Sequence, residues 1–403
     1  MTAKRSINQS ALKQNNIGLV LTEIKRDHLI VKSVLARRLR LSFATVSSIC
    51  EILEEQGFIS MAKKGDSTGG RKPKTIQFIP HARYILALNF SIKEAMHIAL
   101  ISLDYVTIKD VWLRDIYAST CEEMFERVRV AVAELMETVG ITPSDIIGAG
   151  AAVPGLYDEQ YDRINYCTNP MLANIGIQHR LEDLLEIPVQ VMNDANLAAL
   201  GQCTLETQPK ASLMLLYFTE GIGLGIIQDG VIFHGSTGYA GEIGNMRLSV
   251  DADACRLEQF LNLNGILVNY KYYVQNGELL SPRVHEKITE EEQQALFDQL
   301  ITALNRKSIS EITFTKEIGQ QLGWVITTLI DLLNPGTVYI GGDIDALVSH
   351  LLPHIRNYVR RHSIIANVSD VPIKAASVVN LIVKGVGELV FHHWIGRTYS
   401  LQV

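Results

Sequence analysis

Three motifs follow one another between residues 191 and 246, and together they decide the fold. They read Val-Met-Asn-Asp-Ala-Asn at 191–196, Tyr-Phe-Thr-Glu-Gly-Ile-Gly-Leu-Gly-Ile-Ile at 217–227 and Gly-Tyr-Ala-Gly-Glu-Ile-Gly-Asn-Met at 238–246. Apolar strands here lead into an Asn-Asp pair, a glycine-rich loop and a glutamate between glycines. Rigid scaffolds present ligand contacts at such strand ends and loops. The stretch therefore predicts a ligand site, and either catalysis or ligand sensing is compatible with it.

The composition is that of an ordinary globular protein with more than one domain. The 403 residues are 47% hydrophobic and 20% charged, which predicts two or three folded domains. No apolar run reaches the roughly 18 residues that a membrane helix needs, and no apolar segment follows the first residues as in a signal peptide. The cysteines show no CxxC spacing, so we expect a cytoplasmic location without disulfides. They stand at positions 50, 121, 167, 203 and 255.

Residues 1–80 form a basic module with the pattern of a helix-turn-helix. They contain 14 Lys and Arg against 6 Asp and Glu, although the whole chain has a net charge of −6. Clustered apolar residues predict helices at about 8–26, 30–39 and 43–56, with Ser42 as the N-cap of the third. Small residues at the start of the third helix let it enter a major groove. These are Ala44, Thr45, Ser47 and Ser48.

A hairpin after the third helix predicts a wing. Residues 58–61 and 75–79 have the pattern of two strands, and the loop 62–74 between them is basic and rich in glycine. Such a cationic loop follows phosphates or enters a minor groove. The alternative is a small helical interaction domain with a flexible loop, and we favour DNA binding because charge, cap and hairpin agree. The wing residues expected on DNA are Lys63, Lys64, Arg71 and Lys72.

From Tyr84 onward, apolar strands alternate with helices, which predicts an α/β fold with a mixed sheet. The first run has strands at 85–91, 97–104, 146–153 and 189–192, and helices at about 121–139, 177–185 and 196–202. The pattern then restarts, with strands at 211–218, 223–227 and 337–340, and helices at about 287–305, 314–334, 344–361 and 385–396.

A winged helix, an α/β body and the motifs at 193–194, 219–225 and 241–244 together resemble the ROK family of repressors, open reading frames and kinases. The resemblance covers almost the entire chain. Gly-Gly-Arg-Lys-Pro at 69–73 is also similar to the Gly-Gly-Arg-Arg-Pro wing of the repressor branch. The combination is fairly specific, whereas any one of these motifs alone would be a weak signal.

The resemblance implies a winged helix-turn-helix at 1–80 followed by a two-lobed, actin-like or hexokinase-like sugar-binding body. The smaller α/β lobe would span 81–192 and take in a C-terminal helix at about 385–403. The larger α/β lobe would span 193–384, and the sugar would bind in the cleft between the lobes.

The resemblance further implies that carboxylates and carboxamides surround the sugar. A carboxylate can accept from two neighbouring hydroxyls, and a carboxamide offers both a donor and an acceptor. In kinase members the aspartate that matches Asp194 is the general base. The alternative for Asp194 is an N-cap of the following helix, and for Glu242 a loop carboxylate bonded to the backbone. The expected sugar-binding residues are Asn193, Asp194, Glu242, Asn245, Glu258 and, more weakly, Asn169.

The first departure from the kinase pattern concerns the nucleotide. Kinase members open the body with Asp-x-Gly-x-Thr, whereas here Asn89 and Ser91 stand near the Asp and Gly positions. A side chain at the glycine obstructs a phosphate, and loss of the acid removes help with Mg²⁺. Glu220 would add an anion beside the phosphate, and the pair at 341–342 is either a relic of the adenosine pocket or a strand-end turn. We therefore expect neither ATP use nor enzyme activity.

The second departure concerns zinc. Family members carry Gly-His followed by Cys-x-Cys-Gly-x-x-Gly-Cys-x-Glu, which binds zinc through one His and three thiolates. This chain has Gly-Asn at 244–245 and then Asp-Ala-Asp-Ala-Cys-Arg-Leu-Glu at 251–258. One cysteine without a histidine cannot complete a tetrahedral site, so we expect neither zinc nor any other cofactor.

These features predict a transcriptional repressor whose affinity for operator DNA is controlled by a sugar or sugar derivative. We expect a homodimer or higher homo-oligomer on double-stranded DNA, because typical operators have two-fold symmetry, and we expect no membrane partner. Two alternatives stay open, namely an ATP-dependent sugar kinase with an accessory DNA-binding domain and a repressor controlled by a protein partner.

Overall fold

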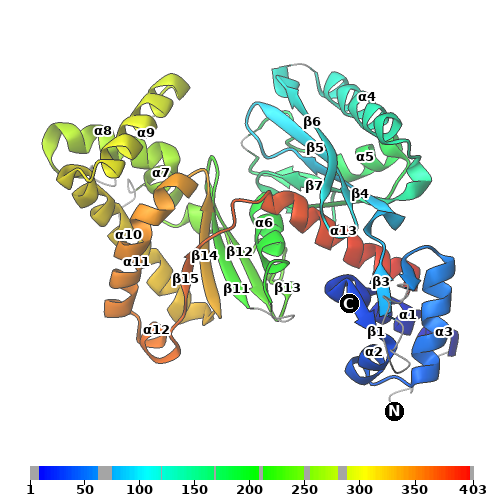
Figure 1. Ribbon diagram of the computed structural model, residues 1–403. Coiled ribbons are helices and arrows are strands. Elements are labelled where there is room, and N and C mark those ends of the chain that lie inside the picture. The colour runs from blue at the N-terminus through cyan, green and yellow to red at the C-terminus, as the bar shows by residue number, and fades with distance from the viewer. Residues whose placement is uncertain are drawn as a thin grey trace, which may run out of the picture.

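The computed structural model describes residues 9–61, 75–118, 120–167, 169–207, 212–248, 255–279 and 288–399. It consists of a small N-terminal head, a smaller lobe and a larger lobe, and each lobe is built on a five-stranded sheet (Figure 1). Two helices, α6 (Asp194–Cys203) and α13 (Leu381–Tyr399), lie between the two sheets. No helix within these ranges is both long and apolar enough to cross a bilayer.

The head is a helix-turn-helix closed by a three-stranded antiparallel sheet of order β1-β3-β2. The predicted N-cap of the third helix is confirmed, because the Ser42 hydroxyl accepts from the Thr45 N–H at 3.0 Å. Leu21, Leu35 and Leu53 are fully buried where the three helices meet. The elements are α1 (Gln9–Asp27), β1 (Leu29–Val31), α2 (Lys32–Leu39), α3 (Phe43–Glu55), β2 (Ile59–Met61) and β3 (Thr75–Phe78).

The second helix starts later than its apolar pattern predicts. The pattern places Ile30 in that helix, but the structure places it in β1, opposite Ile76 of β3. His28, two residues earlier, has a left-handed backbone with φ of 57°, which turns the chain after α1. Pairing with a strand from beyond the wing overrides the local helical pattern, so the prediction is wrong at this position.

The sheet of the smaller lobe has the order β10-β7-β4-β5-β6, in which β4, β7 and β10 run parallel. Alternate residues of β4 face different layers. Leu86 and Leu88 pack with α4 and α5, whereas Ile85 and Ala87 pack with α13. The elements are η1 (Pro80–Ala82), β4 (Tyr84–Asn89), β5 (Ala95–Ser102), β6 (Thr107–Arg114), η2 (Ile116–Ala118), α4 (Cys121–Val139), η3 (Pro143–Asp145), β7 (Ile146–Val153), the hairpin β8 (Leu156–Asp158) and β9 (Arg163–Asn165), α5 (Ile177–Leu185) and β10 (Val189–Asn193).

The sheet of the larger lobe has the order β13-β12-β11-β14-β15. One of its faces packs on α6, and the helices α7 to α12 belong to the same lobe (Figure 1). After α6, its elements are β11 (Leu213–Phe218), β12 (Ile222–Gln228), β13 (Val231–Ile232), η4 (Ile243–Asn245), α7 (Leu257–Leu261), α8 (Leu263–Asn276), α9 (Glu290–Asn305), α10 (Ile309–Leu333), β14 (Thr337–Gly342), α11 (Asp345–His362), α12 (Ile364–Ser369) and β15 (Ile373–Ala375).

The two central helices cross at a pair of glycines. A Cβ on Gly201 of α6 would lie 1.9 Å from the carbonyl oxygen of Leu381, and a Cβ on Gly385 of α13 would lie 1.9 Å from that of Leu197. Neither position admits a side chain, so the two backbones are in direct contact. Since α6 packs on β11 and β12 while α13 packs on β4 and β7, this crossing joins the two lobes.

Gly385→Ala should therefore lower the free energy of unfolding by about 3 kcal/mol or more, because its methyl group would overlap the α6 backbone. Alanine inside a helix otherwise stabilises by roughly 0.5–1 kcal/mol relative to glycine. A loss of stability in this variant would therefore be due to the overlap and not to helix propensity. Urea unfolding measures the change. Gly277→Ala is the control, because a Cβ there meets no atom within 4 Å and only the φ of +75° is unfavourable. A Gly385→Ala variant at least as stable as the wild type would contradict the close crossing.

Candidate functional site

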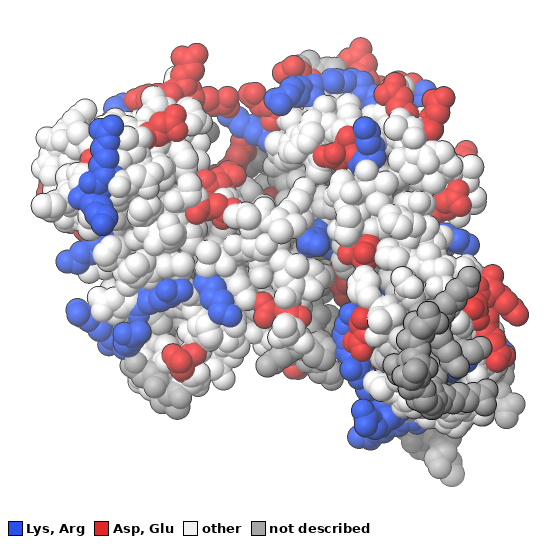
Figure 2. All heavy atoms as spheres, in the orientation of Figure 1, with Lys and Arg blue, Asp and Glu red and all other residues white. Residues whose placement is uncertain are grey.

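A cavity of about 600 Å³ opens between the two lobes. The smaller lobe contributes the end of β10 and residues 155–160, and the larger lobe contributes residues 234–242. Asn193 and Glu242, two of the predicted sugar-binding residues, both line it. On the face drawn in Figure 2, acidic side chains gather around the opening between the lobes.

Asn193 ends β10 and caps α6. Its Oδ1 accepts from the backbone N–H groups of Ala195 at 2.9 Å and Asn196 at 3.3 Å, and its Nδ2 donates to the Gly155 carbonyl at 3.0 Å. The capping role considered for Asp194 thus belongs to Asn193. Because a carboxamide has two N–H groups, Asn193 retains one for a ligand.

Asp194 is the first residue of α6, and only 7% of it is exposed. Its Oδ1 accepts from the Ala195 N–H at 2.8 Å. Burial, together with the charge of Glu242, raises the pKa of Asp194 to about 6, and hydrogen bonds from the backbone and from Ser91 oppose the rise. A buried carboxylate that has lost its water is a strong acceptor for ligand hydroxyls.

Glu242 and Glu258 come from separate segments and converge on the same side of the cleft. Gly241 holds the Glu242 loop against β12, because its φ is +98° and a Cβ there would lie 2.0 Å from the Leu224 carbonyl oxygen. A Cβ on Gly244 would lie 2.9 Å from Oε2 of Glu258, so that carboxylate lies directly beside the loop. Partial burial and the charge of Glu258 raise the pKa of Glu242.

The carboxylate of Glu242 accepts no hydrogen bond from any described residue. The bonds that order its loop run through the backbone instead, as from the Ile243 N–H to the Gly241 carbonyl at 2.7 Å. This arrangement gives no support to the alternative in which Glu242 is bonded to the backbone of its own loop. Its two oxygens are available to a ligand.

The other predicted sugar-binding residues are not part of the cavity lining. Asn245 accepts at Oδ1 from Arg256 at 3.1 Å, and Asn169 accepts at Oδ1 from the Met171 N–H at 3.0 Å. Neither residue is among those that line the cavity, and the same holds for Asp194 and Glu258. Their part in sugar binding stays a prediction.

The structure adds lining residues that the sequence interpretation missed. Asn196 is buried in the first turn of α6, and His234 and Tyr239 come from the larger lobe. The Tyr239 hydroxyl accepts from Asn165 Nδ2 of the smaller lobe at 3.4 Å, so it lies where the two lobes approach each other. Tyr239 stands inside the quoted motif 238–246, which is the signal that could have identified it.

The segment that stands near the Asp-x-Gly-x-Thr position of kinase members forms hydrogen bonds within itself. Asn89 ends β4, and its Oδ1 accepts from the Ser91 backbone N–H at 3.0 Å and from the Ser91 hydroxyl at 2.7 Å. This backbone N–H is the kind of donor that a phosphate would use, and it is already paired. Just beyond, Lys93 forms an ion pair with Glu290 of the other lobe.

The glycines of the second phosphate-type loop have a packing explanation. A Cβ on Gly223 would lie 2.4 Å from the Ala195 Cβ, and a Cβ on Gly225 would lie 2.3 Å from the Ala199 Cβ. Both glycines therefore let β12 pack closely on α6. Gly342 has a φ of +104°, and its Cβ would lie 2.1 Å from a backbone oxygen of β11, which supports the strand-end turn over the adenosine relic.

Three carboxylates, those of Glu220, Asp343 and Asp345, lie near one another after the ends of β11 and β14. Burial and the charges of Asp345 and Glu220 raise the pKa of Asp343 to about 6. Asp345 accepts from the Gly342 N–H at 2.9 Å. Like charges repel strongly in such a poorly solvated place.

No three His, Cys, Asp or Glu side chains of the described ranges lie close enough together to hold a metal ion. Residues 251–254 lie outside those ranges. They belong to the segment that stands where other family members carry the zinc motif.

The predicted DNA-binding residues of α3 divide into two groups. Ala44 and Ser48 are exposed, whereas Thr45 and Ser47 are half-buried. Thr45 Oγ1 lies 2.8 Å from the Ser42 hydroxyl, and Lys32 donates to the Ser47 hydroxyl at 3.0 Å. Thr45 and Ser47 therefore order the start of the helix, whereas Ala44 and Ser48 face outward. The predicted wing residues Lys63, Lys64, Arg71 and Lys72 lie outside the described residues.

The two actin-like α/β lobes form a body like that of sugar kinases. The winged helix-turn-helix head is a DNA-binding module attached to this body. Residues 97–381 match the model of the ROK family. The chain therefore belongs to the ROK family, as its motifs predict.

Curated relatives and solved structures share this architecture. The chain is 25% identical over 380 residues to a xylose repressor of Caldicellulosiruptor bescii, which covers 92% of this chain and 93% of that protein. It is also 25% identical over 370 residues to the DNA-binding transcriptional dual regulator NagC of Escherichia coli K12, with 91% and 89% covered.

Among solved structures, a ROK family transcriptional regulator described as a homologue of the E. coli MLC protein superposes with a TM-score of 0.78. It is 20% identical, and the match covers 97% of this chain and 98% of that one. A ROK family glucokinase from Streptomyces griseus, solved with glucose and AMPPNP, gives a TM-score of 0.59 at 17% identity and covers 76% of this chain and 98% of its own. These likenesses confirm the predicted fold.

Asp194→Asn should stabilise the ligand-free protein at pH 8 by up to about 3 kcal/mol, because it removes a buried negative charge. The folded-state pKa lies above the ordinary value of 3.8, so the charge becomes costly as the pH rises from there to about 6. The gain should therefore shrink as the pH falls through this window. Urea unfolding over a pH series measures it, with the exposed Asp229→Asn as control. A gain that does not vary with pH, or a loss at pH 8, would argue against a buried acid.

Proposed function

We propose that this protein is a transcriptional repressor whose affinity for operator DNA is controlled by an unphosphorylated sugar bound between the lobes. The observation that carries the proposal is the contrast between the two halves of the cleft. The sugar half has Glu242 in the cavity lining and Asp194 and Glu258 close to it, and three such carboxylates could accept from several hydroxyls of one sugar. The nucleotide half is filled by side chains and further acids. Relatives named xylose repressor and N-acetylglucosamine repressor agree with this class of function.

The charge of the cleft favours a neutral ligand. A sugar phosphate would bring its negative charge close to Asp194, whose pKa is already raised by burial and by Glu242. It would also approach Asp343, whose pKa is raised by burial and by two neighbouring acids. The neutral hydroxyls of a free sugar meet no such repulsion.

Phosphoryl transfer is the less favoured function. Asp194 could serve as a base, but the paired Ser91 N–H and the acids at Glu220, Asp343 and Asp345 oppose a bound triphosphate. A coupled ADP-release assay over hexoses and pentoses tests this, and turnover above background would overturn the proposal that the protein is not an enzyme.

The same proposal gives the head its role. The start of α3 would enter the major groove through Ala44 and Ser48, in a homodimer or higher homo-oligomer that matches two half-sites of operator DNA in the cytoplasm. Closure of the lobes on the sugar would change the spacing or angle of the heads. Such a switch requires that the sugar bind one lobe arrangement more tightly than the other.

One neutral sugar among xylose, glucose and N-acetylglucosamine should change the operator Kd at least about fivefold, whereas a phosphate ester of the same sugar should not. Asp194→Ala should remove the response, because the loss of charge-assisted hydrogen bonds raises the sugar Kd at least about tenfold. Fluorescence anisotropy of operator DNA and calorimetry of the sugar measure the two effects. Glu134→Ala, an exposed position on α4, is the control. If no sugar acts and Asp194→Ala behaves as wild type, the sensing role is wrong.

Ser48→Glu should raise the operator Kd at least about tenfold at moderate salt, because it places a negative charge on the exposed start of α3 opposite the phosphates. Ser310→Glu makes the same change at an exposed position of α10 in the larger lobe and should leave the operator Kd within twofold of wild type. Equal operator affinities for the two variants would contradict the placement of α3 on DNA.

A further inference from the structure

The head is attached to the body through a buried lysine. Lys25, in the last turns of α1, has a side chain that is only 14% exposed. Its Nζ lies 3.8 Å from the centre of the Tyr105 ring and 4.8 Å from that of Phe391, so the ammonium group is stacked on two aromatic faces. It also lies 3.9 Å from Oε2 of Glu388 on α13. An ammonium group this enclosed requires a partner charge.

Glu388 collects donors from three parts of the chain. Besides Lys25 of the head, the Tyr105 hydroxyl of the β5–β6 turn donates to its Oε2 at 2.6 Å. His392, one helical turn further along α13, has Nε2 at 2.7 Å from its Oε1. Burial alone would raise the pKa of Glu388, but the His392 hydrogen bond, the charge of Lys25 and the Tyr105 hydroxyl lower it to about 2. We refer to Lys25, Tyr105, Glu388 and His392 as the clasp.

The clasp is one helical turn from the crossing of α6 and α13. Gly385 contacts the α6 backbone, and Glu388 follows it by three residues on the same helix. Gly387 lies between them, and a Cβ there would overlap the Tyr105 ring at 2.3 Å, so this ring rests on the α13 backbone. Since α6 begins at Asp194, only two touching helices separate the cleft carboxylate from Lys25 of the head.

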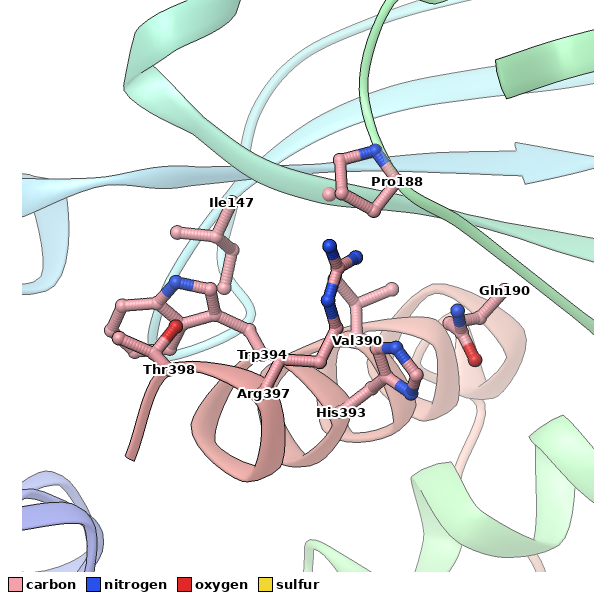
Figure 3. A pocket seen from close by; sticks show the side chains of 9 residues that line it. Ile147, Pro188, Gln190, Val390, His393, Trp394, Arg397 and Thr398 are labelled. Carbon is pink, nitrogen blue, oxygen red and sulfur yellow. The ribbon is translucent and has the colours of Figure 1, made fainter. Parts of the chain in front are cut away.

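The last turns of α13 pack on the head and leave a cavity on their other side. Trp394 contacts Phe58 of the head with ring centres 5.5 Å apart, and the Tyr399 hydroxyl donates to Gln56 at 3.1 Å. Toward the smaller lobe, a cavity of about 240 Å³ opens between part of α13 and the sheet (Figure 3). Its lining includes Ile147, Pro188 and Val390. The last turns of α13 therefore contact both the head and the smaller lobe.

From these contacts we propose that the clasp couples the sugar cleft to the DNA-binding head, with Lys25 and Glu388 as positioning residues that hold the head in one orientation. The inference rests on the proposed sugar control of operator binding. A shift of α6 against α13 on lobe closure moves Glu388, and Lys25 must follow or lose its partner in a buried place. Intermediate positions are therefore unfavourable, and the head moves between discrete orientations.

Lys25→Met tests the coupling, because methionine keeps the apolar stem against Tyr105 and Phe391 and removes the charge. The factor by which the effective sugar changes the operator Kd should fall at least fivefold, and the sugar Kd in the absence of DNA should stay within twofold of wild type. Lys374→Met, at an exposed lysine of the larger lobe, is the control for loss of a lysine charge over a tyrosine. Lys374 also lies over a tyrosine, Tyr339, which donates to Glu206, but this set belongs to the larger lobe.

The double variant Lys25→Met/Glu388→Gln leaves no buried charge without its partner, so it reports on the clasp even if the single variant folds poorly. Small-angle scattering of the sugar-free protein gives a second readout. Both clasp variants should broaden the distance distribution, and Lys374→Met should not. Unchanged scattering together with wild-type coupling in the double variant overturns the proposal. If no sugar acts on the wild type, the proposed function fails and the scattering alone decides the clasp.

Discussion

Direct backbone contact between α6 and α13 is the constraint on which the rest of the structure depends. Two glycines, Gly201 and Gly385, let the helices approach until a methyl group on either would overlap the carbonyl of the other. Each helix packs on the sheet of a different lobe, so any change in the angle between the lobes must alter the contact between the two helices. Glycines in β12 extend the same close packing, since Gly223 and Gly225 let the strand approach Ala195 and Ala199 of α6. The cleft, the crossing and the head are thus connected through one close contact.

Under the proposed function, the cleft recognises a sugar and performs no nucleotide chemistry. Asp194 sits at the start of α6 with Glu242 nearby, so the carboxylates suited to sugar hydroxyls are attached to the same helix that meets α13. The Asn89–Ser91 turn pairs its own donors and acids gather around Asp343, and these two features are the reason that the proposal leaves out a nucleotide. The free energy of sugar binding would then change only the relative position of the lobes and of the head, which is attached to α13.

Local signals were sufficient for most elements and insufficient for contacts between them. The N-cap Ser42 and the bounds of the helix Cys121–Val139 follow from residues adjacent in sequence. The strand β6 was missed because it is a largely exposed edge strand without a continuous apolar run, and Ile30 was misassigned because its partner lies beyond the wing. The loop at 219–225 resembled a phosphate loop, but two of its glycines face alanines of α6, a pairing that no local pattern encodes. The clasp likewise joins Lys25 to Glu388 from opposite ends of the chain.

Thermodynamic reciprocity tests the central claim, that cleft and head are coupled, most directly. Calorimetry would give the Kd of the effective sugar for the free protein and for the protein saturated with operator DNA. If the two sites are coupled, DNA must change the sugar Kd by the same factor by which the sugar changes the operator Kd. The account predicts equal factors of at least about fivefold, in the same direction. A sugar Kd that is identical with and without operator DNA would contradict it.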